Sequence, residues 1–542
     1  MGEVAGALQA SGPLPGGTAA VPDTVHGLIE AAAASWPDAV YAQDVGGRQS
    51  LTFSRLQAQC LEVAALLRAC GCAPGYTVSL VMPNGVQTLR LLLGALHGGW
   101  CVNPVNLLSQ PEQMRYVLEH SDCRVVFASP EWAERVQAVL EGLARPVTLV
   151  VTAPDALCLP GAESAVHLAG AGRVEPDAAP AALLTAPRAS APAATPDALA
   201  LLMYTSGTTG VPKGVMLTQA NLAANARAIS AEHALVPGDR VLAVLPLYHI
   251  NAFAVTMLAP LAHGGSLAMP PRFSAGAFWQ QAVDTGCTWI NVVPTMISYL
   301  LEGPAPLRER TQGIRFCRSA SSALPPEHLK AFEERSGIGV IETMGLTETV
   351  APSFSNPLEA SQRKIGSVGR ASGGEARVVD AALQPVPDGT TGEIVIRGPH
   401  VMRGYYKNDK ATAEAFTPDG WLRTGDLGHR DANGFFFVTG RIKELIIKGG
   451  ENIAPREIDE ALLQHPAVLE AAAVGIPDKH YGQEILACIV PREGMPCTEA
   501  ELRAFCLEKL GRYKTPGVFR FVTELPRGPS GKVQRLKLAS AA

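Results

Sequence analysis

The sequence predicts an α/β protein with a large N-terminal domain of layered α/β subdomains, a small β-rich subdomain and a smaller C-terminal α+β domain. Three observations lead to this fold class. Helix and strand patterns alternate from about Thr24 to Ser129, which is typical of layered α/β architecture. From Gly373 to Arg397 turn residues and β-branched runs give a shorter, β-rich rhythm. After Arg441–Lys443 a last α/β block of about 100 residues follows.

The elements and boundaries follow in chain order from apolar periodicity and from turn and cap residues. We expect a flexible N-terminus over 1–22, an N-terminal domain over 23–442 that contains an Ala/Pro-rich surface connector at 171–197, and a C-terminal domain over 443–542. Thr218 is expected to cap the helix that begins at Gln219. The expected helices are Leu56–Cys70, Gln219–Ala231, Pro455–Leu463 and Glu499–Lys509, and the expected strands are Val78–Met82, Arg124–Ala128, Ala198–Met203, Val241–Leu245 and Ile290–Val293.

Composition excludes several classes of protein. The formal net charge is −5 and no run of five or more Lys or Arg occurs, which argues against a nucleic-acid partner. The most apolar stretch, Val241 to Ala262, contains Pro246, His249 and Pro260, and reads as a core strand plus helix instead of a membrane span. The start lacks a secretory signal, and the 11 cysteines are loosely spaced, so we expect reduced thiols and a cytoplasmic protein.

The loop from Thr205 to Lys213 has the chemistry of a phosphate cradle. Four hydroxyls, backbone N–H groups made accessible by two glycines, and one ammonium group suit phosphate oxygens. A P-loop fails on spacing, because the second glycine would fall on Pro212 and Lys213 is followed by Gly214. Taken alone, the segment could still be a Gly/Thr turn with a solvated lysine. The donors are Thr205, Ser206, Thr208, Thr209 and Lys213, with Gly207 and Gly210 between them.

The segment YTSGTTGVPKGV strongly resembles the signature of the adenylate-forming superfamily, which includes acyl- and aryl-CoA synthetases, stand-alone adenylation domains and luciferases. The later motifs of that superfamily follow in its order, and the resemblance covers about residues 24–536. The motifs are LPLYHIN at 245–251, TMGLTE at 343–348, GEI at 392–394, WLRTGD at 421–426, GRIK at 440–443, YK at 513–514 and PRGPSGK at 526–532.

The resemblance implies a two-step ligase reaction. A carboxylate and Mg-ATP give an acyl-adenylate and pyrophosphate, and CoA then attacks the acyl carbon and releases AMP. The site must place positive charge between two anions, the carboxylate and the α-phosphate. The resemblance implies that Lys532 bridges them, that Lys213 and its loop hold the β- and γ-phosphates, that Thr347 donates to the α-phosphate and that Glu348 is the Mg²⁺ ligand.

The resemblance also assigns the rest of the nucleotide site. Asp426 would accept the ribose hydroxyls with Arg441 as a second contact, although each alone could be a turn aspartate or a surface ion pair. Met344 stands where the family has an aromatic residue on adenine, so stacking is lost there. Lys443 is the implied hinge of a mobile C-terminal domain, and Gly449 and Gly450 belong to the loop that admits CoA. Ser321, Glu342 and Thr343 complete the expected ATP-binding set.

The acid is less well defined by the sequence. His249, which is also a candidate catalytic residue, and Asn251 lie at the expected mouth of the acyl pocket, and Arg318, Ser319 and Gly345 are expected to line it. These polar groups, and the likeness of RSASS and SNPL to oxalate–CoA ligases, favour a small acid with a second anionic group, such as sulfoacetate, oxalate or malonate. Arg318 could instead pair with a neighbouring acid. A medium- or long-chain fatty acid and an aryl acid remain alternatives.

Other functions share part of this pattern. A carrier-loading adenylation enzyme and a luciferase-like oxygenase would use the same adenylation chemistry. A nucleotide sensor is disfavoured because Lys213, Glu348, Asp426, Arg441 and Lys532 are all present. The expected partners are therefore the carboxylate, ATP and CoA, and the sequence leaves a monomer or a homodimer open.

Overall fold

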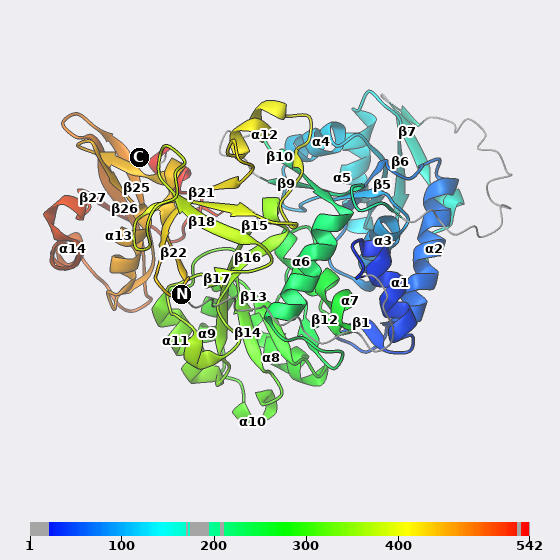
Figure 1. Ribbon diagram of the computed structural model, residues 1–542, viewed down its shortest axis with the longest axis horizontal. Coiled ribbons are helices and arrows are strands. Elements are labelled where there is room, and N and C mark those ends of the chain that lie inside the picture. Colours follow the sequence, from blue (N-terminus) through cyan, green and yellow to red (C-terminus); the bar gives the residue numbers. More distant parts are fainter. Residues whose placement is uncertain (1–20, 170–171, 174–193, 206–210, 528–532, 541–542) are drawn as a thin grey trace, which may run out of the picture.

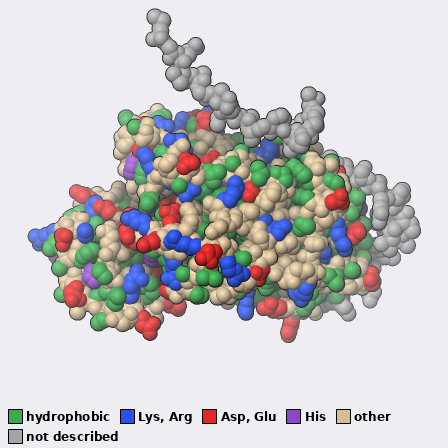
Figure 2. Space-filling view, turned by 90° about the horizontal axis from the view of Figure 1, so that it is seen from below, with side chains coloured by type: hydrophobic (Ala, Val, Ile, Leu, Met, Phe, Trp, Pro, Cys, Tyr) green, Lys and Arg blue, Asp and Glu red, His purple; other side chains and the backbone are tan. Residues whose placement is uncertain are grey.

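The computed structural model describes residues 21–169, 172–173, 194–205, 211–527 and 533–540. Two large sheets stand side by side in the N-terminal part, and the C-terminal part projects from them as a separate lobe (orange to red in Figure 1). No helix in these ranges is long and apolar enough to cross a membrane. Basic and acidic side chains are interspersed on the face that Figure 2 shows.

The first large sheet has the described strand order β20-β10-β9-β4-β3-β5-β6-β7-β8 and is parallel from β9 through β4, β3 and β5 to β6. Apolar β3 is buried along its whole length, as expected for a parallel strand covered on both faces. The strands are β3 (Thr77–Val81), β4 (Cys101–Pro104), β5 (Cys123–Ala128), β6 (Val147–Val151), β7 (Val166–Ala169), β8 (Gly172–Arg173), β9 (Leu199–Thr205), β10 (Lys213–Thr218) and β20 (Gly404–Tyr405).

The second large sheet has the described order β17-β16-β15-β14-β13-β11-β12-β1-β2 and is parallel from β15 to β1. Its parallel strands end at one edge, where open α/β sheets bind their ligands. The strands are β1 (Val40–Asp44), β2 (Ser50–Thr52), β11 (Arg240–Leu242), β12 (Ser266–Met269), β13 (Trp289–Val292), β14 (Phe316–Ser319), β15 (Val340–Leu346), β16 (Ala351–Ser355) and β17 (Arg370–Ala371).

Helices cover these sheets, and most of their apolar stripes join one core that includes the fully buried Trp100 and Trp289, whereas α4 and α5 pack in a second cluster. The helices are α1 (Val25–Ser35), α2 (Phe53–Ala69), α3 (Val86–His97), α4 (Pro111–His120), α5 (Pro130–Glu141), α6 (Gln219–Glu232), α7 (Ala259–His263), α8 (Ala275–Asp284), α9 (Pro294–Glu302), α10 (Arg308–Thr311), α11 (Pro326–Ser336) and α12 (Asp409–Ala415), with short 3₁₀ turns at Ala162–Ser164, Thr347–Thr349 and Ala360–Gln362.

Two smaller sheets complete the fold. An antiparallel sheet contains β18 (Glu375–Val379), β19 (Gly392–Arg397), β21 (Leu422–Arg430) and β22 (Phe436–Arg441). After a 3₁₀ turn at Ile442–Glu444 the chain enters the last sheet. That sheet contains β23 (Ile446–Lys448), β24 (Glu451–Ile453), β25 (Val468–Asp478), β26 (Gly482–Pro491) and β27 (Val518–Phe521), which pack with α13 (Pro455–Leu463), α14 (Glu499–Lys514) and α15 (Arg535–Ser540).

The observed architecture is the predicted mixed α/β fold with a β-rich part and a C-terminal α+β part. Thr218 caps α6 as expected, since its side chain accepts from the Asn221 N–H. Strand β11, however, ends three residues before the expected Leu245. The Asn84 side chain, from the segment between β3 and α3, donates to the Leu245 carbonyl over 2.9 Å and accepts from the Leu247 N–H over 3.0 Å, so this segment leaves the strand ladder.

Two helices contain an irregular stretch. The helix after β11 begins with a π-helical stretch, Ala252–Leu258, in which Thr256 donates to the Ala252 carbonyl over 2.7 Å. Pro260 follows it and lacks the N–H that a regular α-helical ladder would need. Helix α14 has a kink at Gly511, whose φ of 74° and ψ of 171° are not helical, so its long run ends just after the expected Lys509 and a short second run follows.

Candidate active site

The candidate nucleotide site lies where parallel strands β13, β14 and β15 end. Ser319 and Glu342 are register partners on β14 and β15. The Thr343 hydroxyl donates to the Ser319 carbonyl over 3.2 Å, which joins the two strand ends. Ser321 follows on the next loop with a φ of 80°, a rare conformation for a residue other than glycine and one that concentrates at functional sites.

The phosphate-binding candidates come from the β9–β10 hairpin. Thr205 and Lys213 are register partners at the end of this hairpin where the chain passes from β9 to β10. Ser206, Gly207, Thr208 and Thr209 lie outside the described residues. The Lys213 ammonium stands 4.9 Å from the centre of the Tyr405 ring. Because β20 pairs with β10, the hairpin carries its lysine next to this aromatic ring.

Glu348 joins the same group. It lies on the 3₁₀ turn that begins with Thr347, directly after β15. The Tyr405 hydroxyl donates to Glu348 Oε1 over 2.9 Å, and burial together with Glu348 raises the pKa of Tyr405 well above its usual value. The structure therefore brings a carboxylate, a phenol and an ammonium together beside the candidate phosphate loop. Hard oxygen donors of this kind suit Mg²⁺.

Gly345 allows the turn that presents Glu348. A Cβ on Gly345 would stand 1.7 Å from the Ala351 carbonyl oxygen, so no other residue fits there without moving the backbone. Val350 and Ala351 take φ values of 56° and 75°, which is costly for residues with a Cβ. The tight β15–β16 connection therefore holds Thr347 and Glu348 in a fixed position.

Asp426 and Arg441 form the ribose-side candidate. They face each other on β21 and β22, and Arg441 Nε stands 2.8 Å from Asp426 Oδ1. Asp426 is buried, and its charge raises the pKa of Arg441, with smaller contributions from Glu444 and Glu348. Arg441 therefore forms an ion pair, which is one of the two interpretations that its sequence context left open. Because Glu348 also contributes to the raised pKa of Arg441, the pair interacts electrostatically with the Glu348 group.

The adenine-side candidates are less polar. Met344 packs against Phe354 and Phe436, in the cluster between β15–β16 and the β-rich sheet. Glu342 is buried beside it, and one carboxylate oxygen accepts from the Leu324 N–H over 3.3 Å while the other has no partner among the described residues. Burial raises the pKa of Glu342 to about 7.

The acyl-pocket candidates form a buried polar cluster. Arg318 Nη1 donates to Asn251 Oδ1 over 2.8 Å and to Asn291 Oδ1 over 2.9 Å. His249 begins the helical turn that carries Asn251, since its carbonyl accepts from the Phe253 N–H. Ser319 follows Arg318 in β14, and strand alternation directs the two side chains to opposite faces of the sheet. Ser319 therefore does not share the Arg318 cluster.

The C-terminal candidates lie on the last lobe. Lys443 is exposed within the turn that links β22 to β23. Gly449 and Gly450 form a two-residue hairpin turn between β23 and β24, with φ values of 55° and 87° that favour glycine. Lys448, just before them, is buried and pairs with Glu484 over 2.6 Å. Lys532 lies outside the described residues.

Two residues of the site were not predicted from the sequence. Asn291 is the polar residue within an otherwise apolar buried strand, and this contrast is the signal that could have found it. Tyr405 carries no such signal, because its role depends on the pairing of β20 with β10.

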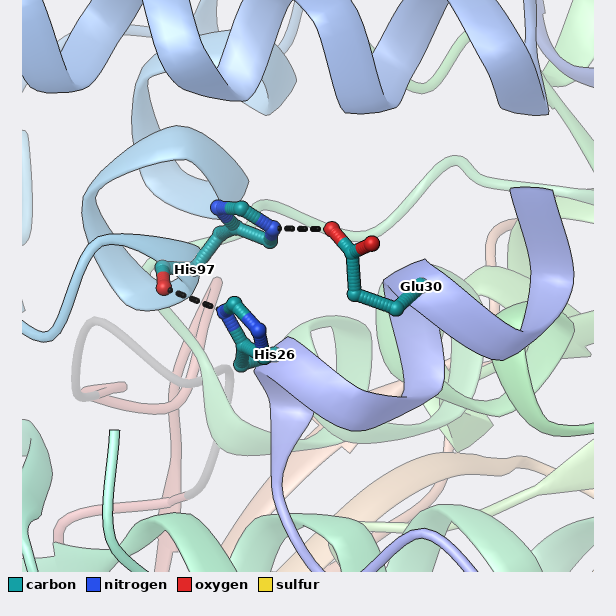
Figure 3. Close-up of side chains that lie close together, drawn as sticks. All are labelled: His26, Glu30 and His97. Atoms are coloured by element: carbon teal, nitrogen blue, oxygen red, sulfur yellow. Dashed lines mark hydrogen bonds and ion pairs between the residues drawn. The ribbon is translucent and has the colours of Figure 1, made fainter. Parts of the chain in front are cut away.

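A third polar cluster lies elsewhere, between α1 and the end of α3 (Figure 3). His97 Nε2 stands 2.6 Å from Glu30 Oε1, and His26 Nδ1 stands 2.9 Å from the His97 carbonyl oxygen. The two imidazole rings stack with centres 4.2 Å apart and planes 26° from parallel. Stacked rings direct their nitrogens sideways instead of toward one ion, and we interpret the cluster as a contact that fixes α1 on α3.

Comparisons with known proteins agree with this geometry. The AMP-binding enzyme family matches residues 29–406, and the AMP-binding enzyme C-terminal domain matches residues 457–532. The chain is 58% identical to sulfoacetate–CoA ligase of Cupriavidus necator, over 96% of this chain and 98% of that one. It is 36% identical to oxalate–CoA ligase of Arabidopsis thaliana, over 95% and 97% of the two chains.

Solved structures share the complete fold. The ATP-bound crystal structure of MatB from Rhodopseudomonas palustris superimposes with a TM-score of 0.84 at 28% identity, over 96% of this chain and 99% of that one. The Bacillus subtilis o-succinylbenzoate CoA synthetase with its acyl-adenylate gives a TM-score of 0.80 at 28% identity, over 94% and 97%. The chain therefore belongs to the AMP-binding enzyme family of adenylate-forming proteins, and within it to the AMP-forming acid–CoA ligases.

Proposed function

We propose that this acid–CoA ligase activates a small carboxylic acid that bears a second anionic group, with sulfoacetate as the leading candidate. The observation that carries the proposal is the 58% identity to a sulfoacetate–CoA ligase over almost the whole of both chains. The oxalate–CoA ligases in the comparison also act on an acid with two anionic groups, but they are less similar.

The nucleotide-site residues have matching tasks in this proposal. Lys213 and Glu348 stand at the phosphate end, joined through Tyr405, and Asp426 with Arg441 stands at the ribose end. Glu348 would hold Mg²⁺, which supplies positive charge to the phosphates when it is bound. Lys532 would neutralise the repulsion between the carboxylate and the α-phosphate during adenylation.

The second half-reaction involves the C-terminal lobe. Lys443 lies between the β-rich sheet and the last sheet, where a rotation of the lobe needs only a few backbone dihedral changes. We propose that the Gly449–Gly450 turn then approaches the acyl-adenylate and admits the pantetheine arm of CoA. Both glycines already have a backbone conformation that side chains disfavour.

We also propose a reducing compartment, the cytoplasm, as the site of the reaction. All eleven cysteines are free thiols, and nine of them are buried. Burial raises the pKa of several of these thiols, including those of Cys70 to about 11 and Cys287 to about 11, so they stay protonated and unreactive at neutral pH.

A panel of acids tests the proposal. Purified enzyme is incubated with ATP, Mg²⁺ and CoA together with sulfoacetate, oxalate, malonate, octanoate or benzoate, and each thioester is identified by mass. We expect sulfoacetyl-CoA to form fastest, with AMP as the nucleotide product. Faster thioester formation from octanoate or benzoate than from every small diacid would show that the acid is misassigned. AMP formation that does not depend on CoA would point to a luciferase-like or carrier-loading enzyme.

A further inference from the structure

Arg318 is a buried cation whose described partners are all neutral. Its exposed fraction is 1%, and Nη1 donates to the side-chain oxygens of Asn251 and Asn291. Both amides are buried, and Asn291 Nδ2 donates to Asn251 Oδ1 over 3.3 Å. Among the described residues no carboxylate lies within ion-pair distance of this guanidinium, and burial alone lowers its pKa to about 9.

An unpaired buried charge is expensive, and the buried cations of this chain meet that cost in different ways. The half-buried Arg535 lies between Asp459 and Glu444, and the buried Lys448 pairs with Glu484. Buried Arg90, like Arg318, donates to neutral oxygens, those of Gln87, Ala156 and Leu157. An isolated charge in a low-dielectric interior costs several kcal/mol unless an opposite charge joins it. No carboxylate among the described residues compensates the charge of Arg318.

The Arg318 cluster also contains hydrogen-bond donors that have no acceptor among the described residues. Arg318 Nε and Asn251 Nδ2 are buried and have no acceptor among the described residues. The amide oxygens of Asn251 and Asn291 hold the other side of the guanidinium in place. A fixed cation with spare donors on the same cluster is the arrangement that recognises an anionic oxygen group.

The cluster also has the right position. Asn291 and Arg318 are register partners near the carboxyl ends of parallel strands β13 and β14. The next residue of β14, Ser319, pairs with Glu342 of the candidate nucleotide site, and these side chains point to the other face of the sheet. Asn251 precedes the π-helical stretch, a local widening that often accompanies functional sites. The cluster is thus one residue along the strands from the expected adenylation site.

We propose that Arg318, Asn251 and Asn291 form the subsite for the second anionic group of the acid, at the end away from the carboxylate that reacts. This inference rests on the proposed function and specifies its substrate class as short acids with a distal sulfonate or carboxylate. A monoanionic acid would leave the guanidinium unpaired and is therefore rejected.

The subsite has a consequence for both half-reactions. Adenylation removes the charge of the reacting carboxylate, but it leaves the distal anion unchanged. Arg318 therefore holds the free acid and also the acyl-adenylate, and its loss should weaken both steps. This distinguishes a substrate-binding arginine from a residue that acts only during adenylation.

The first test compares sulfoacetate with 3,3-dimethylbutyrate, in which a neutral tert-butyl group replaces the sulfonate. For the Arg318→Gln variant, kcat/KM with sulfoacetate should fall by about 100-fold or more, whereas kcat/KM with 3,3-dimethylbutyrate should stay equal or rise. Arg315→Gln is the matched control, because Arg315 lies on the same segment but pairs with Asp239 at the surface. Arg315→Gln should keep the wild-type ratio of the two substrates.

Asn291→Asp gives a second, independent test that does not depend on removing the arginine. It places a carboxylate of nearly the same shape next to Arg318 Nη1, so the enzyme supplies its own counter-charge. We expect a higher melting temperature and a loss of sulfoacetate use of about 100-fold or more. An unchanged preference for sulfoacetate in either folded variant overturns the subsite. If the wild-type enzyme activates no small diacid at all, the proposed function fails instead.

Discussion

Arg441 and Asp426 face each other across strands β22 and β21, with Nε and Oδ1 2.8 Å apart, at the point where the β-rich sheet meets the 3₁₀ turn that leads to the C-terminal lobe. The pair therefore combines its proposed nucleotide-binding role with a position at the junction between the lobes. A buried carboxylate with one face held by a guanidinium is oriented before a ribose arrives.

The Asp426→Asn variant tests this role. Loss of the negative charge should raise KM for ATP by about tenfold to a hundredfold, because a charge-assisted contact to the ribose is replaced by a neutral one. Steady-state kinetics at saturating acid and CoA measure the change. Asp388→Asn is the control, since Asp388 forms an exposed ion pair with Arg430 on the same sheet. An equal effect of the two variants would show that Asp426 contributes only to stability.

Replacing Glu348 by Gln should reduce adenylation by about 100-fold or more and raise the Mg²⁺ concentration needed for half-maximal rate. Tyr405→Phe removes the hydroxyl that donates to Glu348 and should cost about fivefold. Tyr406→Phe is the matched control, because the neighbouring hydroxyl donates to Asp122 instead. Unchanged Mg²⁺ dependence in Glu348→Gln would remove this residue from the metal site.

The proposed rotation of the C-terminal lobe between the two half-reactions predicts opposite defects in two variants. Lys532→Ala should abolish pyrophosphate release yet retain the reaction of supplied acyl-adenylate with CoA. Gly450→Leu should slow the reaction with CoA and leave pyrophosphate exchange nearly unchanged, although a side chain at a φ of 87° costs about 1 kcal/mol of stability. Rapid-quench measurement of each half-reaction separates the two. Equal slowing of both half-reactions in both variants would contradict the proposed rotation of the C-terminal lobe.

Glu342 should make stability depend on pH. Its pKa of about 7 lies above the usual 4.5, so between these values the folded protein binds more protons than the unfolded chain and its stability falls as pH rises. Glu342→Gln should remove this loss, which is on the order of 3 kcal/mol. Thermal unfolding at pH 5 and pH 8 measures it, with the exposed Glu327→Gln as control. A wild-type pH response in Glu342→Gln would show that another group causes the pH dependence.

Sequence reasoning located the elements that depend on local chemistry. The cap at Thr218, the bounds Pro455–Leu463 of α13 and the alternation that predicts layered α/β structure are all set by neighbouring residues. Contacts between distant parts of the chain were not predicted. The early end of β11 depends on Asn84, and the environment of Glu348 depends on Tyr405. Neither partner is marked by a local pattern.

In the candidate site, too, local sequence motifs were informative, whereas contacts between distant residues could not be predicted. The motifs predict a set of residues for the nucleotide site, since each motif carries its own loop chemistry. The sequence could not decide whether Arg318 pairs with a neighbouring acid, because that depends on which strands lie beside β14. The parallel register of β13 and β14 places Asn291 there, and the amide leaves the charge of Arg318 uncompensated.

The most direct measurement is the exchange of labelled pyrophosphate into ATP with sulfoacetate present and CoA absent. If the enzyme forms a sulfoacetyl-adenylate reversibly, the exchange should depend on the acid and on Mg²⁺. Once CoA is added, AMP should be the nucleotide product. No exchange with any small acid, or formation of ADP and phosphate, would contradict the account.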